Sequence, residues 1–202
     1  MMKKIISALA FGILVSSCAS SWTLVSKENT HIRLSRLSLT IPDGWVFYNN
    51  HFNEYTAVVN GHRVDKKVKR VVVTRDGLNL DVIDIIEFDS DNAFPSLERK
   101  SVQKSTLPSE LAELFIAEQK TTLGIDNLQV VKSEPVIVAG QKGFSVRLRF
   151  KSKSGLQMEQ VACGILTANK FYTFKFTAPS LYYFETNLPE FETLVKSVTV
   201  NS

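Results

Sequence analysis

The chain has 202 residues, of which 44% are hydrophobic and 22% are charged. This length and composition indicate one globular domain with enough apolar material to bury a core. The formal net charge is only +4 at pH 7. Because proteins that bind nucleic acid carry strongly basic patches, we expect no nucleic-acid partner.

The first 17 residues have the order of a secretory signal peptide. Lys3 and Lys4 form a basic start, and an apolar stretch follows over residues 5–15. This stretch is shorter than the roughly 20 residues that a membrane-spanning helix needs. We therefore predict a lipoprotein signal peptide over residues 1–17. Its removal would leave 22 basic and 20 acidic residues, a net charge of +2.

Cys18 closes the tetrapeptide Val-Ser-Ser-Cys, which resembles the lipobox of bacterial lipoproteins. In that class the cysteine becomes the acylated first residue of the mature protein. Acyl chains contribute about 0.8 kcal/mol per buried CH₂, so two or three chains anchor a protein stably without a transmembrane helix. The resemblance implies a covalent, palmitate-type lipid on Cys18, no other cofactor, and attachment to a membrane of the bacterial cell envelope.

Two further predictions depend on this anchor. Ala19 follows the cysteine. In enterobacterial sorting an Asp at this position retains lipoproteins in the inner membrane, so the resemblance implies an outer-membrane protein that faces the periplasm. Residues 18–30 are mainly polar and are predicted to form the lipidated N-terminus and a tether, and residues 31–202 the domain.

Cys163 is the other of the two cysteines. It lies in an apolar run with no histidine near it in sequence. With Cys18 acylated, no intramolecular disulfide is available. We expect Cys163 to be a small buried hydrophobic residue rather than a catalytic or redox group.

The first part of the domain is predicted to consist mainly of strands. Leucine and isoleucine recur over residues 32–41, and the alternation slips between Leu34 and Leu37, which indicates a bulge. Residues 42–44 form a turn in which proline presets φ and glycine takes positive φ. Further strands are predicted over residues 45–48, 55–59, 71–74 and 80–88.

An amphipathic helix is predicted over residues 106–123. Thr106 or Ser109 can cap its start, and Gly124 can end it. Short apolar stretches at residues 128–131 and 136–138 then lead into the last third of the chain.

That last third is predicted to contain three strands and a helix. Residues 144–151 alternate apolar and polar side chains, as in a strand with one buried face. Residues 161–166 are apolar at both alternations, which indicates cover on both sides. A strand at residues 171–176 follows, then a helical turn from Ser180 and a separate helix with Asn187 as its N-cap.

The order of these motifs resembles the PsbP-like family, including its bacterial lipoprotein relatives, over about residues 32–200. The resemblance lies in Ile41-Pro42-Asp43-Gly44-Trp45, in residues 138–144, 171–174 and 178–179, and in the end of the last helix at residues 194–197. It implies an α+β fold in which an antiparallel sheet of about six strands is flanked by helices on both faces, a PsbP-like α/β/α sandwich. Family members serve as accessory or assembly factors of photosynthetic complexes, as a nuclear-import cofactor and as envelope proteins of unknown role. The resemblance therefore implies no catalytic residue set and does not decide the function.

No motif of a known reaction centre is found. His31, His51 and His62 are the three histidines, and none has the spacing of a metal-binding motif. His51 and His62 flank a predicted strand with Glu54 and Asp65 nearby, which leaves a surface metal site as an alternative to solvated loop histidines. Our prediction is that the protein has no metal site and no catalytic residue.

Two groups of basic residues are candidate contacts for an anionic partner. Arg63, Lys66 and Lys67 belong to a basic run, and Arg147 and Arg149 alternate along one strand. They would meet anionic lipid head groups or an acidic protein. The alternative is an exposed loop and a solvated sheet face that resists edge aggregation.

Two functions follow from this sequence. The leading prediction is a lipid-anchored, non-enzymatic interaction or accessory module of the envelope, with a membrane and an envelope protein as its partners. The alternative is a small-ligand carrier or sensor with a pocket between sheet and helix, lined by aromatic side chains such as Trp45, Tyr172 and Tyr182.

Overall fold

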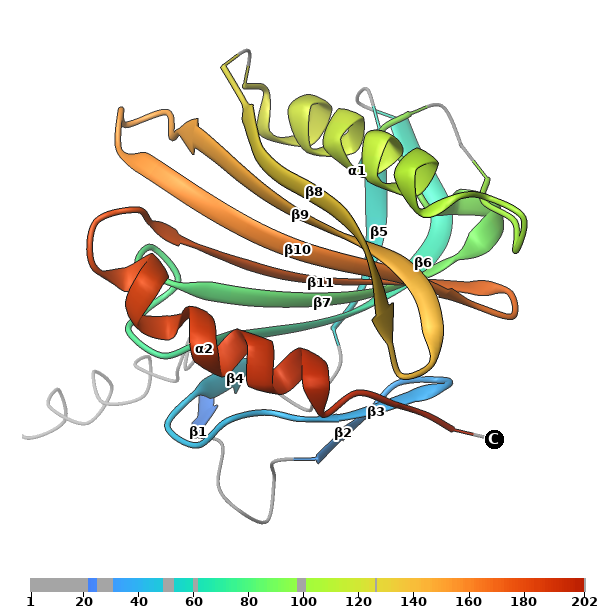
Figure 1. Cartoon of the computed structure of the whole chain (residues 1–202), viewed down its shortest axis with the longest axis horizontal. Coiled ribbons are helices and arrows are strands. Elements are labelled where there is room, and N and C mark those ends of the chain that lie inside the picture. The colour runs from blue at the N-terminus through green and yellow to red at the C-terminus, as the bar shows by residue number, and fades with distance from the viewer. Residues whose placement is uncertain are drawn as a thin grey trace, which may run out of the picture.

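The computed structural model describes residues 22–24, 31–48, 53–59, 62–97, 101–125 and 127–201. Its largest element is a nine-stranded antiparallel sheet in the order β1-β4-β6-β7-β11-β10-β9-β8, in which β5 also pairs with β6 (Figure 1). Six of its strands have eight or more residues: β6 (His62–Thr74), β7 (Val82–Asp89), β8 (Gln129–Val138), β9 (Gln141–Lys151), β10 (Gln157–Thr167) and β11 (Lys170–Pro179). The shorter strands are β1 (Trp22–Leu24), β4 (Val46–Tyr48) and β5 (Asn53–Val59).

Two helices cover opposite faces of this sheet (Figure 1). Helix α1 is Pro108–Leu123 and helix α2 is Tyr183–Lys196, and a short 3-10 helix, η1, spans Ser90–Asn92. The burial of β10 alternates between the two: Ala162 belongs to the core under α1, and Cys163 and Ile165 belong to the core under α2. The α+β fold class, with six long strands and helices on both faces, is therefore confirmed.

A second, three-stranded sheet lies beside α2, in the order β12-β3-β2. It consists of β2 (His31–Arg33), β3 (Leu37–Thr40) and β12 (Thr199–Val200). The single bulged strand predicted over residues 32–41 is therefore wrong. The chain reverses between β2 and β3, where the Leu34 N–H donates to the Leu37 carbonyl at 2.8 Å, and this turn brings both leucines into one core.

The basic run, for which an exposed loop was the alternative to a partner contact, belongs to the long strand β6. β6 pairs with β7 only over residues 69–73, whereas it pairs with β5 from His62 to Arg70. Among the described residues, the first half of β6 therefore has β5 as its only neighbour in the sheet. Together they form a two-stranded ribbon that extends past the end of β7 (Figure 1).

Helix α2 starts earlier than the sequence indicates. It is one continuous helix from Tyr183, with Pro189 inside it, rather than a separate turn followed by a helix. Asn187, the predicted N-cap, is buried, and its side-chain amide donates to Asp81 at 2.9 Å. The Asn187 side chain therefore binds Asp81, which is far away in the sequence, instead of capping the helix.

Helix α1 agrees better with its prediction. It begins at Pro108, and Gly124, at φ 61°, ends it in the left-handed conformation. Neither predicted N-terminal cap is used: the Leu107 N–H donates to the Glu110 carboxylate at 3.0 Å, and the Thr106 hydroxyl accepts the Gln103 N–H instead. β8, predicted as two short stretches, is one edge strand that tolerates Pro135 because it pairs only with β9.

Candidate functional site

Cys18 lies outside the described residues, so its acylation stays a prediction. The first described strand, β1, begins at Trp22, inside the segment predicted to be the tether. Its backbone pairs with β4, with Leu24 opposite Val46, and Val46 lies opposite Thr74 of β6. Part of the predicted tether therefore joins the outer edge of the main sheet.

Arg63, Lys66 and Lys67 all lie on the ribbon formed by β5 and β6. Arg63 is paired with Val58 and Lys67 with Thr56, and an irregularity in the register separates the two pairs. The basic positions are thus grouped on one projecting hairpin. The side chains at these positions lie outside the described part of the structure.

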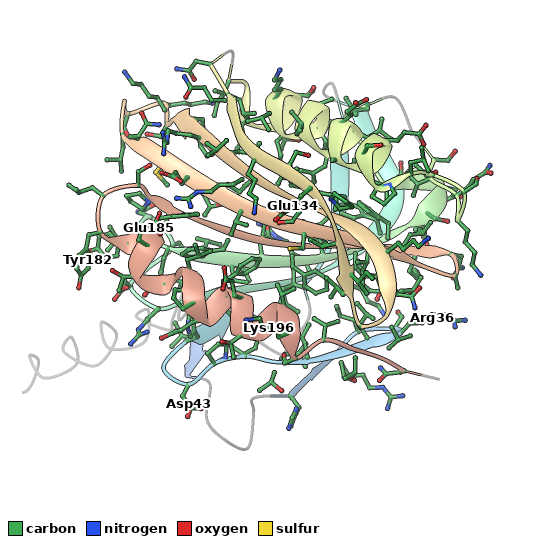
Figure 2. All side chains as sticks on the ribbon, viewed as in Figure 1. Arg36, Asp43, Glu134, Tyr182, Glu185 and Lys196 are labelled. Carbon is green, nitrogen blue, oxygen red and sulfur yellow. The ribbon has the colours of Figure 1, made fainter. Side chains whose placement is uncertain are left out.

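Arg147 and Arg149 lie together on β9 and share one buried acid. Arg147 donates to Glu159 at 2.6 Å and Arg149 donates to it at 3.0 Å, and the Glu159 side chain is only 5% exposed. Arg147 also pairs with Glu185 of α2, which Figure 2 shows at the start of that helix. Its guanidinium carbon is 4.7 Å from the ring centroid of Phe184.

The electrostatics of Arg147 follow from this arrangement. Burial by itself lowers the pKa of Arg147, but its hydrogen bonds to Glu185 and Glu159 raise the pKa above its ordinary value. Arg147 therefore joins α2 to β9 and β10, and Arg149 joins β9 to β10. Arg149 keeps 43% of its side chain exposed, so of the two it is the more accessible to a partner.

The aromatic residues predicted to line a pocket do not line one. Trp45 and Tyr172 are fully buried in the core under α2, whereas Tyr182 is 69% exposed and points away from the molecule (Figure 2). The Phe176 ring stacks on Phe184 and Phe191 with centroids 5.4 and 5.9 Å apart. Aromatic rings fill the space between the sheet and α2, so the predicted position of the pocket is wrong.

A cavity of about 140 Å³ lies on the opposite face of the sheet, beside α1. Its walls come from α1, β7, β11 and the segment after η1. The lining residues are Ile86, Phe88, Ala93, Phe94, Pro95, Ser96, Phe115, Glu118, Gln119, Thr122, Phe171, Thr173 and Lys175. An engineered apolar cavity of about 150 Å³ holds one benzene molecule, so this one is large enough for a small ring.

Charged side chains border the cavity on the sheet side. Lys175 of β11 is 3.2 Å from Asp84, the residue opposite it on β7. Arg70 donates two hydrogen bonds to the same carboxylate, at 2.7 and 2.9 Å. Burial alone would raise the pKa of Asp84, but the neighbouring Lys175 and Arg70 bring it below its ordinary value, so Asp84 is ionised.

The α1 side of the cavity carries a carboxyl and an amide. Both oxygens of Glu118 accept the Ser96 N–H, at 3.0 and 3.2 Å, and burial raises the pKa of Glu118 above its ordinary value. Gln119 is only 6% exposed. Its side-chain amide forms no hydrogen bond within the described part of the chain, and its polar atoms are reached by solvent.

Sequence analysis missed this cavity, although two signals for it are present. Asp84 and Lys175 each interrupt a strongly apolar strand, and a charge inside such a strand needs a partner on the same face. Their pairing could have been inferred only from the strand order, in which β7 and β11 are neighbours.

A second polar cluster joins the β2–β3 turn to β7. The Ser35 hydroxyl and backbone N–H both donate to Glu87, at 2.6 and 2.9 Å, and Lys69 donates to the same hydroxyl at 3.0 Å. A serine between an acid and a lysine has the residue types of a nucleophile site. Here the Ser35 hydroxyl donates a hydrogen bond to the Glu87 carboxylate, and the Ser35 N–H donates to the same group. These two hydrogen bonds fasten the β2–β3 turn to β7.

The structure describes Cys163 and two of the three histidines, His31 in full and His62 by its backbone. Cys163 is buried, and burial raises the pKa of its thiol to about 11, which agrees with the predicted hydrophobic role. The His31 ring is 3.2 Å from the Thr40 hydroxyl, His51 lies outside the described residues, and only the backbone of His62 is described. The described residues contain no group of three or more side chains that would bind a metal ion.

Among the described residues, neither helix has the length and apolar character needed to cross a membrane. No family model and no curated protein sequence matches the chain.

Solved structures do match. Cyanobacterial PsbP from Synechocystis sp. PCC 6803 is 15% identical, with a TM-score of 0.52 over 97% of this chain and 98% of that chain. LpqN of Mycobacterium tuberculosis, described as involved in cell envelope biogenesis, is 12% identical, with a TM-score of 0.43 over 90% and 91%. The Ran-binding protein Mog1p of Saccharomyces cerevisiae is 12% identical, with a TM-score of 0.42 over 89% and 94%. At these identities, and with only the first score above 0.5, the matches bear on fold alone: the chain has the PsbP-like fold that its motifs predict.

Proposed function

We propose that the protein is a non-enzymatic interaction or accessory module of the bacterial envelope, anchored to a membrane by a lipid on Cys18. The observation that carries the proposal is the position of β1. Only residues 19–21 separate Cys18 from this strand, which pairs with the sheet. A fully extended chain covers about 3.5 Å per residue, so the lipidated residue would lie within roughly 14 Å of Trp22.

This short connection would hold one edge of the domain close to the lipid surface. By the residue that follows Cys18, the membrane is the outer membrane and the domain faces the periplasm. The β5–β6 ribbon belongs to the same region of the sheet, since β4 pairs with the other half of β6. We propose that the ribbon, through Arg63, Lys66 and Lys67, contacts an acidic surface of an envelope protein.

Arg147 and Arg149 have a secondary place in this proposal. Their cationic groups are already paired with Glu159 and, for Arg147, with Glu185. A partner would have to compete with these acids or bind the exposed part of Arg149. The ribbon is therefore the first surface to test.

The anchor is tested by intact-mass measurement of the protein from the membrane fraction. We expect a protein that begins at Cys18 and carries the mass of its acyl chains. Cys18→Ser should move the protein to the soluble fraction, whereas Cys163→Ser, the control, should leave it in the membrane. An unmodified Cys18 with residues 1–17 still attached would refute the anchor.

The partner surface is tested by crosslinking in intact cells at native expression. The double variant Lys66→Glu with Lys67→Glu should lose a crosslinked envelope protein that the unaltered chain captures. Lys151→Glu with Lys153→Glu is the matched control, because it makes the same change of charge at two exposed positions at and after the end of β9. Equal capture by both double variants would refute the assignment to the ribbon.

A small-ligand carrier or sensor is the second candidate function. One observation favours it: the cavity of about 140 Å³ beside α1, which contains both aromatic and polar side chains. The two functions are compatible, because the cavity and the ribbon use different residues.

A further inference from the structure

The apolar part of the cavity is built from phenylalanine rings. Phe94 and Phe171 have ring centroids 5.1 Å apart, and those of Phe88 and Phe171 are 6.4 Å apart. Phe115 of α1 completes this wall. Such a wall offers favourable contacts to a flat or compact apolar group of about one six-membered ring.

Gln119 and Thr173 bring hydrogen-bond donors to the cavity wall. The Gln119 side chain lines the cavity, and the residue is 94% buried. Neither its amide nor the hydroxyl of Thr173, which lines the same cavity, has a hydrogen-bond partner within the described residues, and the polar atoms of both are open to solvent in the cavity. Both groups can donate a hydrogen bond to a molecule in the cavity.

The charges around the cavity decide what that molecule carries. Asp84 is already bound by two hydrogen bonds from Arg70, and the contact of Lys175 with it is longer, at 3.2 Å. A lysine ammonium has three donors, so Lys175 keeps donors for a second anion while it stays beside Asp84.

The one carboxyl in the described wall of the cavity, Glu118, has part of its charge offset by a hydrogen bond. Both oxygens of Glu118 are directed at the Ser96 N–H, which neutralises part of their charge. The raised pKa of Glu118 also favours its neutral form. Lys175 attracts Glu118 as well as Asp84, so an anion in the cavity would share Lys175 with these two acids, whereas the uncharged donors Gln119 and Thr173 are not paired with an acid.

We propose that this cavity binds a small organic carboxylate with an apolar body about the size of one six-membered ring. The carboxylate meets Lys175 and the Gln119 amide, and the body lies against Phe94, Phe115 and Phe171. This inference rests on the second candidate function and names the chemistry of its ligand. It is independent of the lipid anchor and of the ribbon.

The test uses three probes with the same ring, similar size and different charge: benzoate, benzyl alcohol and benzylamine. Each is titrated into the full-length protein in detergent, and the side-chain amide resonance of Gln119 is followed by NMR. Gln119→Leu identifies that resonance, and Gln103→Leu, at an exposed position, is the matched control. We expect a saturable shift with benzoate and at least tenfold weaker binding of the other two probes.

Substitutions then locate the carboxylate. Lys175→Met should weaken benzoate binding at least tenfold and leave benzyl alcohol unchanged, because Arg70 still holds Asp84. Lys153→Met, at an exposed position, should change neither. Gln119→Leu should weaken benzoate binding by a smaller factor, and thermal unfolding of each variant shows that it is folded.

Three results would overturn the inference, and they can be told apart. If benzylamine binds best, the ligand class is wrong but the carrier function stands. If benzoate binds equally well to Lys175→Met, the carboxylate lies elsewhere. If none of the three probes shifts the Gln119 resonance, the cavity holds water only, and both the inference and the carrier function fail.

Discussion

The two faces of the main sheet are closed in different ways. Under α2 the space is filled by aromatic rings, and Arg147 joins that helix to the sheet from the side. Beside α1 the same sheet carries a cavity bordered by charged and amide groups. One sheet thus provides a close-packed face that gives stability and a partly polar face with room for another molecule.

The difference between the two faces originates in the side chains of β11, which alternate between them. Phe174 and Phe176 point toward α2, whereas Thr173 and Lys175 point to the other face. Helix α1 packs mainly against β8 and β9. Over this part of β11, residues of α1 and of the segment after η1 together line the cavity. The polar side chains Thr173 and Lys175 leave this space less closely filled than the phenylalanine rings on the other face.

The largest effect is expected from truncation on the close-packed face. Phe176→Ala should lower the free energy of unfolding by about 4 kcal/mol, because the ring is fully buried and stacks on Phe184 and Phe191. Phe115→Ala, beside the existing cavity, should cost roughly 1 kcal/mol less, since its neighbours can relax into that space. Urea unfolding measures both, and equal losses would remove the distinction between the faces.

The next effect concerns the charged part of the α1 face. Asp84→Asn leaves Arg70 and Lys175 facing a neutral amide and should cost about 3 kcal/mol at pH 7. The pKa of Asp84 is lowered in the folded protein, so its stabilisation is present above the unfolded value of 3.8 and is lost as the pH falls below it. The difference in the free energy of unfolding between the unaltered protein and Asp84→Asn, measured in urea, should therefore become smaller in acid. A difference that stays constant down to pH 2 would contradict the ion pair.

A smaller loss is expected at Gly164 of β10, which lies opposite an aromatic ring of β9. A Cβ on Gly164 would lie 2.3 Å from a ring carbon of Phe144, on the strand opposite. Gly164→Ala should therefore cost about 2 kcal/mol through overpacking. Phe144→Leu removes the ring, so the double variant should lose less than the sum of the two single losses. Additive losses would show that the clash is relieved in another way.

The sequence alone predicted the elements whose pattern is local. The double-sided apolar run of β10 and the end of α1 at Gly124 follow from side-chain spacing and backbone preference, and no distant residue changes them. The N-cap at Asn187 failed because Asp81, 106 residues away, binds the same amide. A capping motif shows only that a polar group is available, not which partner takes it.

The candidate site was harder to predict because it is assembled from distant segments. The pattern of β11 marks Lys175 as unusual, but the cavity exists only because α1, the segment after η1 and two strands meet around it. Trp45 and Tyr172 were assigned to a pocket from residue type alone, and aromatic side chains more often fill a core than line a cavity. Cys163, by contrast, was assigned correctly because its apolar neighbours are adjacent in the sequence.

The smallest expected effect separates the two acids of the polar face by the sign of their pH dependence. Burial raises the pKa of Glu118 in the folded protein, so its contribution is most favourable below the unfolded value of 4.5 and is lost as the pH rises through the folded value. Glu118→Gln removes this dependence. Between pH 4 and pH 7 the unaltered protein should therefore lose stability relative to Glu118→Gln. Relative to Asp84→Asn, it should gain stability as the pH rises from acid. Urea unfolding at four pH values measures both differences. If the two acids showed the same sign, the raised pKa of Glu118 would be wrong, even though the cavity would remain.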